Sequence, residues 1–476
     1  MGASLVSHST YERLSSQDSS FVMFEHRATH MHVSAVAVFE TAPLATADGG
    51  LDVGRVSKHI ESRLHLIPHY RQRLRFTPLQ RQPIWVDDPR FNLHYHVRHA
   101  SLPRPGSRDA LKTLAGRILS QHLDREKPLW EIWLIEGLEE GRFAMIAKVH
   151  HCMVDGAAGV NLMTLLLSPS PNGEVEPAPA WRPRKPPGPL RLLVDEGFRR
   201  ARVPLSLLNG VRASLETPRV VWEGVKDAGD ALRQALLAGF QVPADTPLNR
   251  AIGPHRRIDW HTLELVEVKD LKKRLDGTIN DVVLAIVAGA VRHFLRARNA
   301  QPHGPGFRVM VPVNMRSGAQ DLAASNQVSG YFLPLPIEEP DPLRRVQRIK
   351  DAMRHVKQSK VARGIELMTR FADWSGSTFM TLAGVRLASR LQPYNLIVTN
   401  VPGPQFPLYL LGARMLEVYP HLPLFENQGL GVAVMSYHGR ISWGLVGDWE
   451  LLPDLPVFTR AVDLAFNELR EAAESL

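Results

Sequence analysis

HHCMVDG, at residues 150–156, lies between two segments of opposite character. RFAMIAKVH (Arg142–His150) precedes it, and the aromatic and β-branched residues of this run predict a strand. GAAGVNLMTLLL (156–167) follows, and its small residues and leucine-rich end predict a helix that starts close against a sheet. Another strand-like run, LWEIWLI (129–135), precedes a turn signal at 139–141 and predicts a hairpin with the first strand. We therefore expect strands and helices to alternate in this part of the chain.

The two adjacent histidines at the end of the predicted strand point to opposite faces, so only one of them can face a given channel. Strand parity places His151 on the side of Met145, Ala147 and Val149. Asp155 falls in the tight strand-to-helix connection, where a carboxylate accepts backbone hydrogen bonds or pairs with a cation and so braces the loop. An imidazole fixed in this way suits a general base that takes a proton from a hydroxyl or thiol. The residues alone leave open the alternative that both histidines only satisfy hydrogen bonds in the core.

Other chemistries have less support in the sequence. A metal site is disfavoured because HExxH is absent and no second cluster of histidine or glutamate accompanies His151 and Asp155. Cys152, the only cysteine, suits packing better than nucleophilic attack, since neighbours on a strand face away from each other. There is no G-x-S-x-G elbow and no phosphate loop, and Gly429-Leu430-Gly431 lacks a third glycine at Val434. Serine hydrolase, P-loop and Rossmann functions are therefore disfavoured.

The rest of the chain predicts a second part built like the first. Eight prolines between 169 and 189 predict an exposed linker, which helices over 190–240 follow. Periodicity elsewhere predicts strands in the second half of 21–40, at 260–268, 307–313 and 396–401 and within 431–446, and helices at 108–123, 280–296 and 342–360. We divide the chain into an N-terminal lobe (1–168), a proline-rich and helical linker (169–255) and a C-terminal lobe (256–476), with a cleft between the lobes.

Composition narrows the class of protein. The chain has 476 residues, of which 44% are hydrophobic and 22% charged, and this suits a compact two-domain body. The net charge of +9 favours anionic partners such as phosphate groups or acidic lipid, whereas nucleic acid is disfavoured because no aromatic platform accompanies the basic residues. The single cysteine and the absence of a signal-like apolar run lead us to expect a cytoplasmic protein. Four prolines interrupt the uncharged run 391–413, so we expect any membrane contact to be peripheral.

Several motifs, taken together, resemble one family. HHxxxDG at 150–156 is similar to the motif of the coenzyme A-dependent acyltransferase superfamily, and its flanks narrow the resemblance to bacterial wax ester synthase/acyl-CoA:diacylglycerol acyltransferases. The similar segments are, in order, LSSQDSSFVMFE with MHV, KPLWEIWLIEGL, KVHHCMVDGAAG, TINDVVLAIVAGAVR, VMVPVNMR and NLIVTNVPGP. They span nearly the whole chain, and the long proline-rich insert departs from the family pattern.

The resemblance implies an α/β (α+β) fold of two chloramphenicol-acetyltransferase-like lobes, with mixed sheets flanked by helices and a tunnel between the lobes. It implies that His151 deprotonates an acceptor alcohol, which attacks the thioester of acyl-CoA without a covalent enzyme intermediate. Acyl-CoA would be a co-substrate, with no bound cofactor and no metal. The acceptor would be a long-chain alcohol or diacylglycerol. Separately from the resemblance, the basic amphipathic surface leads us to expect peripheral contact with a membrane or lipid-droplet surface. The alternatives are a carrier-bound polyketide or peptide acceptor, and a non-catalytic acyl-CoA or lipid-binding protein.

Further site residues are predicted by local sequence patterns and by the family resemblance. Asn280 and Asp281 precede an apolar helix, where such residues commonly cap the first free amides; the resemblance implies instead a role facing the tunnel. Arg316 is, by the resemblance, the partner of Asp155 in a buried ion pair that supports the site, beside Gly156.

Three more segments have sequence patterns that predict a local structure or role. Pro128, Leu129 and Trp130 are expected to shape the entrance of a strand, and their apolar bulk also suits the wall of an acyl channel. NVPGP (400–404) predicts a rigid turn in which Gly403 takes a positive φ. The helix predicted at 342–360 combines an apolar stripe with many basic residues, so it suits either an interfacial membrane helix or a helix packed on the core; the stripe is Val346, Ile349, Met353 and Val356.

Overall fold

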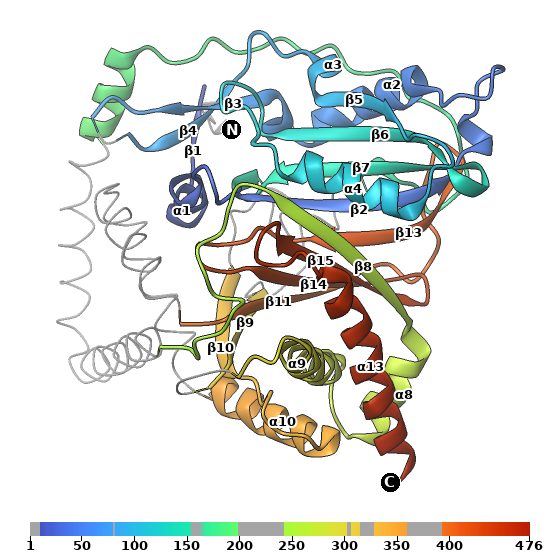
Figure 1. The fold of residues 1–476 in the computed structure, drawn as a ribbon. Helices are drawn as coiled ribbons and strands as arrows, with labels where there is room; N and C mark the ends of the chain where they lie inside the picture. The colour runs from blue at the N-terminus through green and yellow to red at the C-terminus, as the bar shows by residue number, and fades with distance from the viewer. Residues whose placement is uncertain are drawn as a thin grey trace, which may run out of the picture.

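A computed structural model of the chain describes residues 10–79, 81–153, 163, 165–198, 242–301, 306–314, 328–358 and 393–476. Two six-stranded mixed sheets form its framework, one above the other in Figure 1, and helices cover the lower sheet from below. This confirms the predicted fold class of mixed sheets flanked by helices. The tunnel between the lobes stays a prediction.

The first sheet is built around the hairpin that the sequence predicts. Its strand order is β12-β13-β2-β7-β6-β5, and only the pair β5–β6 is parallel. The strands span Tyr409–Leu410 (β12), Ala413–His421 (β13), His32–Glu40 (β2), Arg142–His150 (β7), Trp130–Leu138 (β6) and Val97–Ser101 (β5). A smaller sheet, in the order β1-β4-β3, packs nearby and comprises Glu12–Arg13, Pro83–Asp87 and Gln72–Phe76.

The second sheet has the order β10-β9-β11-β14-β15-β8, with parallel pairing of β11 to both β9 and β14. Its strands span Val328–Pro334 (β10), Arg308–Asn314 (β9), Leu396–Pro402 (β11), Leu430–Tyr437 (β14), Arg440–Asp448 (β15) and Arg256–Glu264 (β8). The strand predicted at 260–268 is therefore displaced, because Leu265, Val268 and Leu271 lie at helical spacing and bury one face of the next helix.

The helices occupy the outer faces and the space beneath the second sheet. They span Ser16–Phe24 (α1), Val53–Arg63 (α2), Leu93–His96 (α3), Arg108–Leu119 (α4), Leu265–Arg274 (α8), Ile279–Ala297 (α9), Pro342–Gln358 (α10) and Leu455–Glu474 (α13). Short 3-10 turns lie at Ala42–Leu44, Leu64–Leu66, Pro68–Arg71, Glu139–Gly141 and His151–Met153 (η5). The predicted helices at 108–123, 280–296 and 342–360 are thus confirmed.

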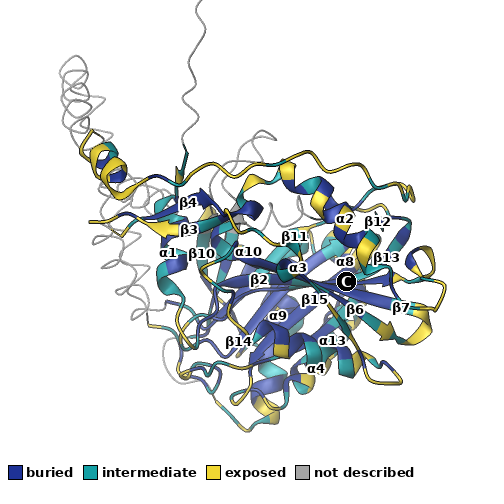
Figure 2. Ribbon diagram, turned by 90° about the horizontal axis from the view of Figure 1, so that it is seen from above, coloured by how far each residue is buried: buried dark blue, intermediate teal, exposed yellow. Residues whose placement is uncertain are grey.

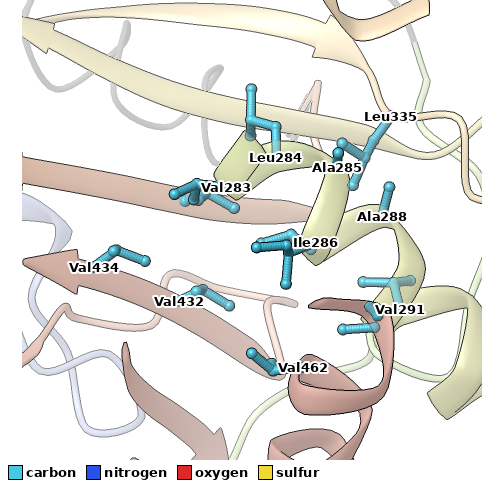
Figure 3. Packing of buried hydrophobic residues seen from close by; sticks show 14 of the residues in the cluster. Val283, Leu284, Ala285, Ile286, Ala288, Val291, Leu335, Val432, Val434 and Val462 are labelled. Atoms are coloured by element: carbon cyan, nitrogen blue, oxygen red, sulfur yellow. The ribbon is translucent and has the colours of Figure 1, made fainter. Parts of the chain in front are cut away.

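Helix α9 lies at the centre of the hydrophobic core beneath the second sheet, which we call the second core. Residues Val282 to Val291 are buried without interruption, because α9 is covered by the second sheet, α10 and α13 at once. Figure 3 shows Ile286 of α9 packed toward Val432 and Val434 of β14 and Val462 of α13. Burial on all sides explains a helix that is apolar all round.

Helix α10 shows which of its two predicted roles the structure supports. Val346, Ile349 and Met353 are at most 7% exposed and belong to the second core, and Val356 packs against it. The apolar stripe is therefore committed to the interior, and the idea that these residues insert into a membrane interface is wrong. Arg345 is also buried, beside Glu468 of α13.

The two lobes are joined by strand exchange. Strand β13 comes from the second half of the sequence, yet it pairs with β2 from Ser34 to Phe39 and completes the first sheet. The same strand contacts β14 and β15 of the second sheet, where the Pro420 carbonyl lies directly over Gly444. Arg256, at the start of β8, adds a second link, since its guanidinium donates to the Ala28 carbonyl oxygen in the first lobe.

The proline-rich segment has no regular structure from 171 to 188 and runs as an exposed strap over the first lobe (Figures 1 and 2). A helix begins at 189 and is described as far as 198. Most of the helix predicted at 156–167, and the predicted helices beyond 198, lie outside the described residues. Within the described ranges, no single helix has the length and hydropathy of a membrane span; α8 and α9 meet that test only together, across a bend of 99°.

Candidate active site

The two motif histidines differ because the strand ends between them. His150 is the last residue of β7, and His151 opens the 3-10 turn η5. The strand-parity argument for His151 is therefore wrong in its detail, since the backbone has already left the strand. The two histidines nevertheless differ in burial, since His150 is buried while His151 is partly exposed.

His150 is held from inside the protein. Its Nδ1 accepts the Cys152 amide at 3.1 Å and lies 2.9 Å from the Cys152 thiol sulfur. Its Nε2 faces the Glu25 carboxylate at 3.8 Å. Burial lowers the pKa of His150 to about 4, so the ring is neutral at pH 7 and carries its proton on Nε2. A neutral, buried ring of this kind supports the loop rather than exchanging protons with a substrate.

His151 is placed by two contacts from the N-terminal segment. Its amide donates to the Met31 carbonyl oxygen at 2.7 Å, which ties the turn to the residue before β2. Its ring stacks on Phe21 of α1 with a centroid separation of 4.0 Å and an interplanar angle of 26°. The stack fixes the plane of the imidazole while part of the residue stays exposed. A ring that is oriented and accessible meets the geometric requirement for a general base.

Pro128, Leu129 and Trp130 contribute through the backbone and the core. The Leu129 carbonyl oxygen accepts the His150 amide at 3.0 Å, so this segment locks the end of β7. Trp130 is 1% exposed, donates from Nε1 to the Tyr70 carbonyl oxygen at 2.8 Å and stacks on His96. The described geometry is that of a strand entrance, as expected, and Trp130 lies within the core of the first lobe.

A buried polar row behind the histidines has no counterpart in the sequence predictions. Lys148 is fully buried, and its Nζ donates to the carbonyl oxygens of Ile118 and Gln121 at 3.2 and 3.1 Å. Its ammonium also lies 3.3 Å from Glu131, and His32 Nε2 lies 3.0 Å from the Leu119 carbonyl oxygen. These groups satisfy the free carbonyls at the C-terminus of α4, where positive charge is favourable. The available signal was a lysine in an otherwise apolar strand.

Asp281 forms a capping box at the start of α9. Its carboxylate accepts the Thr278 amide at 2.8 Å and the Thr278 hydroxyl at 2.7 Å, while its own amide donates to that hydroxyl at 3.2 Å. The N-cap is therefore Thr278, and Asp281 occupies the third helical position. The predicted capping role thus applies to Asp281, although Asn280 is not the cap. Asn280 lies partly exposed on the first turn of α9.

The NVPGP segment differs from its prediction. Asn400, Val401 and Pro402 continue β11 in parallel register with β14, so the turn begins only after Pro402. Gly403 is not among the residues with positive φ. Glycine is required there for a different reason, because a Cβ would overlap the Ser436 carbonyl oxygen and approach Met435. The segment is a close contact between strands.

Three predicted site residues, Asp155, Gly156 and Arg316, lie outside the described residues, so the proposed Asp155–Arg316 pair stays a prediction. Cys152 is described and is buried among Leu14, Val22 and Leu129. Burial raises the pKa of its thiol well above the usual value, which keeps the sulfur protonated. The packing role predicted for Cys152 agrees with this environment.

Two family models match this chain. Residues 14–283 match the wax ester synthase/diacylglycerol acyltransferase catalytic domain, and residues 324–470 match the WS/DGAT C-terminal domain. The chain belongs to the wax ester synthase/diacylglycerol acyltransferase family. It is an acyltransferase, as the resemblance of the motifs implied.

Individual members of this family align over almost the full chain. A putative diacylglycerol O-acyltransferase of Mycobacterium tuberculosis is 35% identical over 97% of this chain and 91% of its own length. A probable diacylglycerol O-acyltransferase of the same organism is 30% identical over 96% of this chain and 95% of its own. The solved wax ester synthase/diacylglycerol acyltransferase of Marinobacter aquaeolei is 26% identical, covers 97% of this chain and 100% of its own, and superposes with a TM-score of 0.69.

The fold extends beyond the family. A condensation domain of the calcium-dependent antibiotic synthetase superposes with a TM-score of 0.58 at 16% identity, over 98% of this chain and 97% of its own. At that identity the likeness concerns the two-lobe fold alone.

Buried histidines predict that this acyltransferase loses stability in mild acid. Burial lowers the pKa of His30 to about 4 and of His421 to about 3, as it does for His150, from an ordinary value of 6.5. The folded state therefore favours the neutral rings, while the unfolded chain takes up protons below about pH 6.5. Stability is complete above pH 6.5 and falls by about 1.4 kcal/mol per pH unit for each such histidine down to about pH 4. Thermal melting between pH 7 and 4.5 measures this.

His421→Leu is the matched control for the acid effect. Within the described residues neither ring nitrogen of His421 has a hydrogen-bond partner, and the residue is 3% exposed. An apolar side chain of similar volume should therefore leave the melting temperature at pH 7 unchanged or higher and flatten its fall in acid. A melting temperature that is constant from pH 7 to 5 in the wild type would contradict the prediction.

Proposed function

We propose that this acyltransferase moves a long-chain acyl group from acyl-CoA to a long-chain alcohol or diacylglycerol, with His151 as general base. The observation that carries the role of His151 is its position directly after the end of β7, where its ring stacks on Phe21 and the residue is partly exposed. His150, by contrast, is neutral and buried. Of the two motif histidines, His151 is the one that is partly exposed.

The reaction follows from the chemistry of a thioester. His151 takes the hydroxyl proton of the acceptor as the oxygen attacks the acyl carbonyl carbon, and a C–O bond forms. The tetrahedral intermediate then collapses, the C–S bond breaks, and coenzyme A leaves as a thiolate that recovers the proton from the imidazolium. Because a thiolate is a good leaving group, a positioned base and oxyanion donors suffice without a covalent enzyme intermediate. Acyl-CoA is thus a co-substrate, and the chemistry needs no further cofactor.

The acceptor is tested by measuring free coenzyme A. Purified enzyme is given palmitoyl-CoA with medium-chain alcohol, long-chain alcohol or diacylglycerol, and release of the thiol is followed with the ester product. We expect release that depends on a lipid acceptor. Release of coenzyme A only with a carrier-bound polyketide or peptide acceptor would favour an acyltransferase that acts on such a carrier-bound substrate. Binding of palmitoyl-CoA without release under any condition would favour a non-catalytic lipid-binding protein.

The setting of the reaction is proposed from surface charge. We propose a cytoplasmic enzyme that touches membrane or lipid-droplet surfaces peripherally, since its substrates are lipids and its net charge is +9. The outer face of α10 exposes Arg344, Arg348 and Arg354, although each has an acidic neighbour within 4 Å.

Flotation with anionic liposomes tests this surface. Reversal of the charge of Arg344, Arg348 and Arg354 to glutamate should reduce the bound fraction, and added salt should do the same for the wild type. Neutral liposomes are the control for attraction by charge. Unchanged flotation of the triple variant would exclude α10 as the contact.

A further inference from the structure

Two residues of the N-terminal helix segment lie against the motif histidines. Phe21 of α1 stacks on His151, and Glu25, the C-cap residue of the same helix, faces His150. Helix α1 contacts the turn η5 directly and lies at the end of the first sheet, close to the start of β2 (Figure 1). One short helix therefore touches both histidines, one with an aromatic ring and the other with a carboxylate.

We propose that Glu25 is a positioning residue of this acyltransferase: its carboxylate orients His150, and His150 holds the backbone turn from which His151 projects. The inference rests on the proposed role of His151 as base. Glu25 does not touch the reacting atoms, since its contacts lie on the interior side of His150.

The His150 ring has a defined direction. Nδ1 accepts the Cys152 amide at 3.1 Å, so the proton of the neutral ring is on Nε2. That N–H dipole faces Glu25 Oε2 at 3.8 Å, which is too long for a hydrogen bond but favourable between a carboxylate and the positive end of a dipole. The carboxylate thus favours the one tautomer that leaves Nδ1 free to accept the Cys152 amide.

Glu25 is ionised although its position is unfavourable. Its side chain is 4% exposed, and the C-terminus of a helix repels negative charge. Burial alone would raise its pKa, but the positive charge of Arg125, joined by that of His150 whenever this ring is protonated, outweighs burial, and the pKa of Glu25 is lowered. Arg125 contacts the carboxylate at 2.6 Å and also donates to the Val22 carbonyl oxygen at 2.9 Å, which caps α1. A buried carboxylate kept charged beside a catalytic motif calls for a role.

The turn η5 needs a hydrogen-bond acceptor for the amide of Cys152. The amide of Cys152 lies inside η5, directly after His151, and donates to His150 Nδ1. If His150 carried its proton on Nδ1, two donors would face each other and this contact would be lost. The other charged and titratable groups around His150 and its turn are Arg125, His122, His32, His151, Cys152 and Asp18. Asp18 acts on the Cys152 thiol, whereas Glu25 is the carboxylate that faces His150 Nε2, so Glu25 supplies the orienting charge.

The test compares Glu25→Gln with Glu131→Gln. Glu131 is a second buried carboxylate, 5% exposed, whose contacts are Lys148, Arg98 and Trp133 rather than His150. We expect Glu25→Gln to lower kcat by about 10- to 100-fold, in line with the cost of a misplaced catalytic group, with KM for palmitoyl-CoA unchanged. We also expect faster amide hydrogen exchange in the peptide that contains Cys152. Glu131→Gln should change neither the exchange of that peptide nor kcat in this way, although both variants lose thermal stability.

The outcomes separate this role from a merely structural one. Wild-type kcat and exchange in folded Glu25→Gln would overturn the proposal, and so would equal losses of kcat and melting temperature in both variants. If Glu25→Gln does not fold, Glu25→Asp keeps the charge while withdrawing it from His150; the same two changes, smaller in size, are then expected, and wild-type behaviour overturns the proposal. Hydrogen exchange does not depend on the reaction, so it still reports on Glu25 if His151 proves not to be the base.

Discussion

His151→Ala is expected to remain folded and to lose about two to four decades of turnover, the range for removal of a general base. His151 opens the turn η5 and is partly exposed, so we expect truncation of its side chain to leave the core intact. Coenzyme A release from palmitoyl-CoA in the presence of a long-chain alcohol measures kcat. Because binding of acyl-CoA does not need the base, its KM should change far less than kcat.

His94→Ala provides the control, because His94 is exposed on α3 in the same lobe and is remote from the motif in sequence. It should match the wild type in both turnover and melting temperature. Circular dichroism and thermal melting establish that His151→Ala is folded. Coenzyme A release near the wild-type rate by that folded variant would remove His151 from the mechanism.

Local periodicity in the sequence predicted the strands and helices that are buried on one face or on all sides. Strand β7, its hairpin partner β6 and helix α9 all have sequence patterns that depend only on their own neighbours. The exchange of β13 into the first sheet had no such signal, since its pairing with β2 joins segments from opposite ends of the chain. Strand pairing between distant segments is decided by the whole fold, so local patterns predicted neither the strand at Ala413–His421 nor its pairing with β2.

The candidate site was predicted in the same uneven way. The motif indicated His150 and His151, and the structure agrees that one is buried and the other accessible. Their supports, Phe21 and Glu25, were not predicted as site residues, because a contact between α1 and η5 leaves no periodic trace. Gly403 shows a related limit: sequence indicated that glycine mattered, but the reason was a close approach to Ser436 rather than a positive φ.

Gly444→Ala is expected to cost about 3 kcal/mol or more of folding free energy, the upper part of the range for overpacking. Gly444 lies in β15 opposite Trp260 of β8, and a Cβ there would overlap the carbonyl oxygen of Pro420 in β13. Since the obstacle is backbone, no side-chain rotation relieves it. Strand β13 is held on its other side by pairing with β2, so the substitution forces the two sheets apart.

Gly447→Ala is the matched control in the same strand. The atoms nearest to its Cβ would be side-chain atoms of Leu452 and Leu455, none closer than 3.1 Å, so the crowding is much less than at Gly444. We therefore expect a small fall in melting temperature for Gly447→Ala and a large fall, with loss of soluble protein, for Gly444→Ala. If both variants melted like the wild type, the contact between β13 and β15 would not be tight enough to fix the lobes. If Gly444→Ala alone is destabilised, the exchanged strand β13 holds the second sheet against the first, where His421 and the motif histidines lie at the same end of the first sheet.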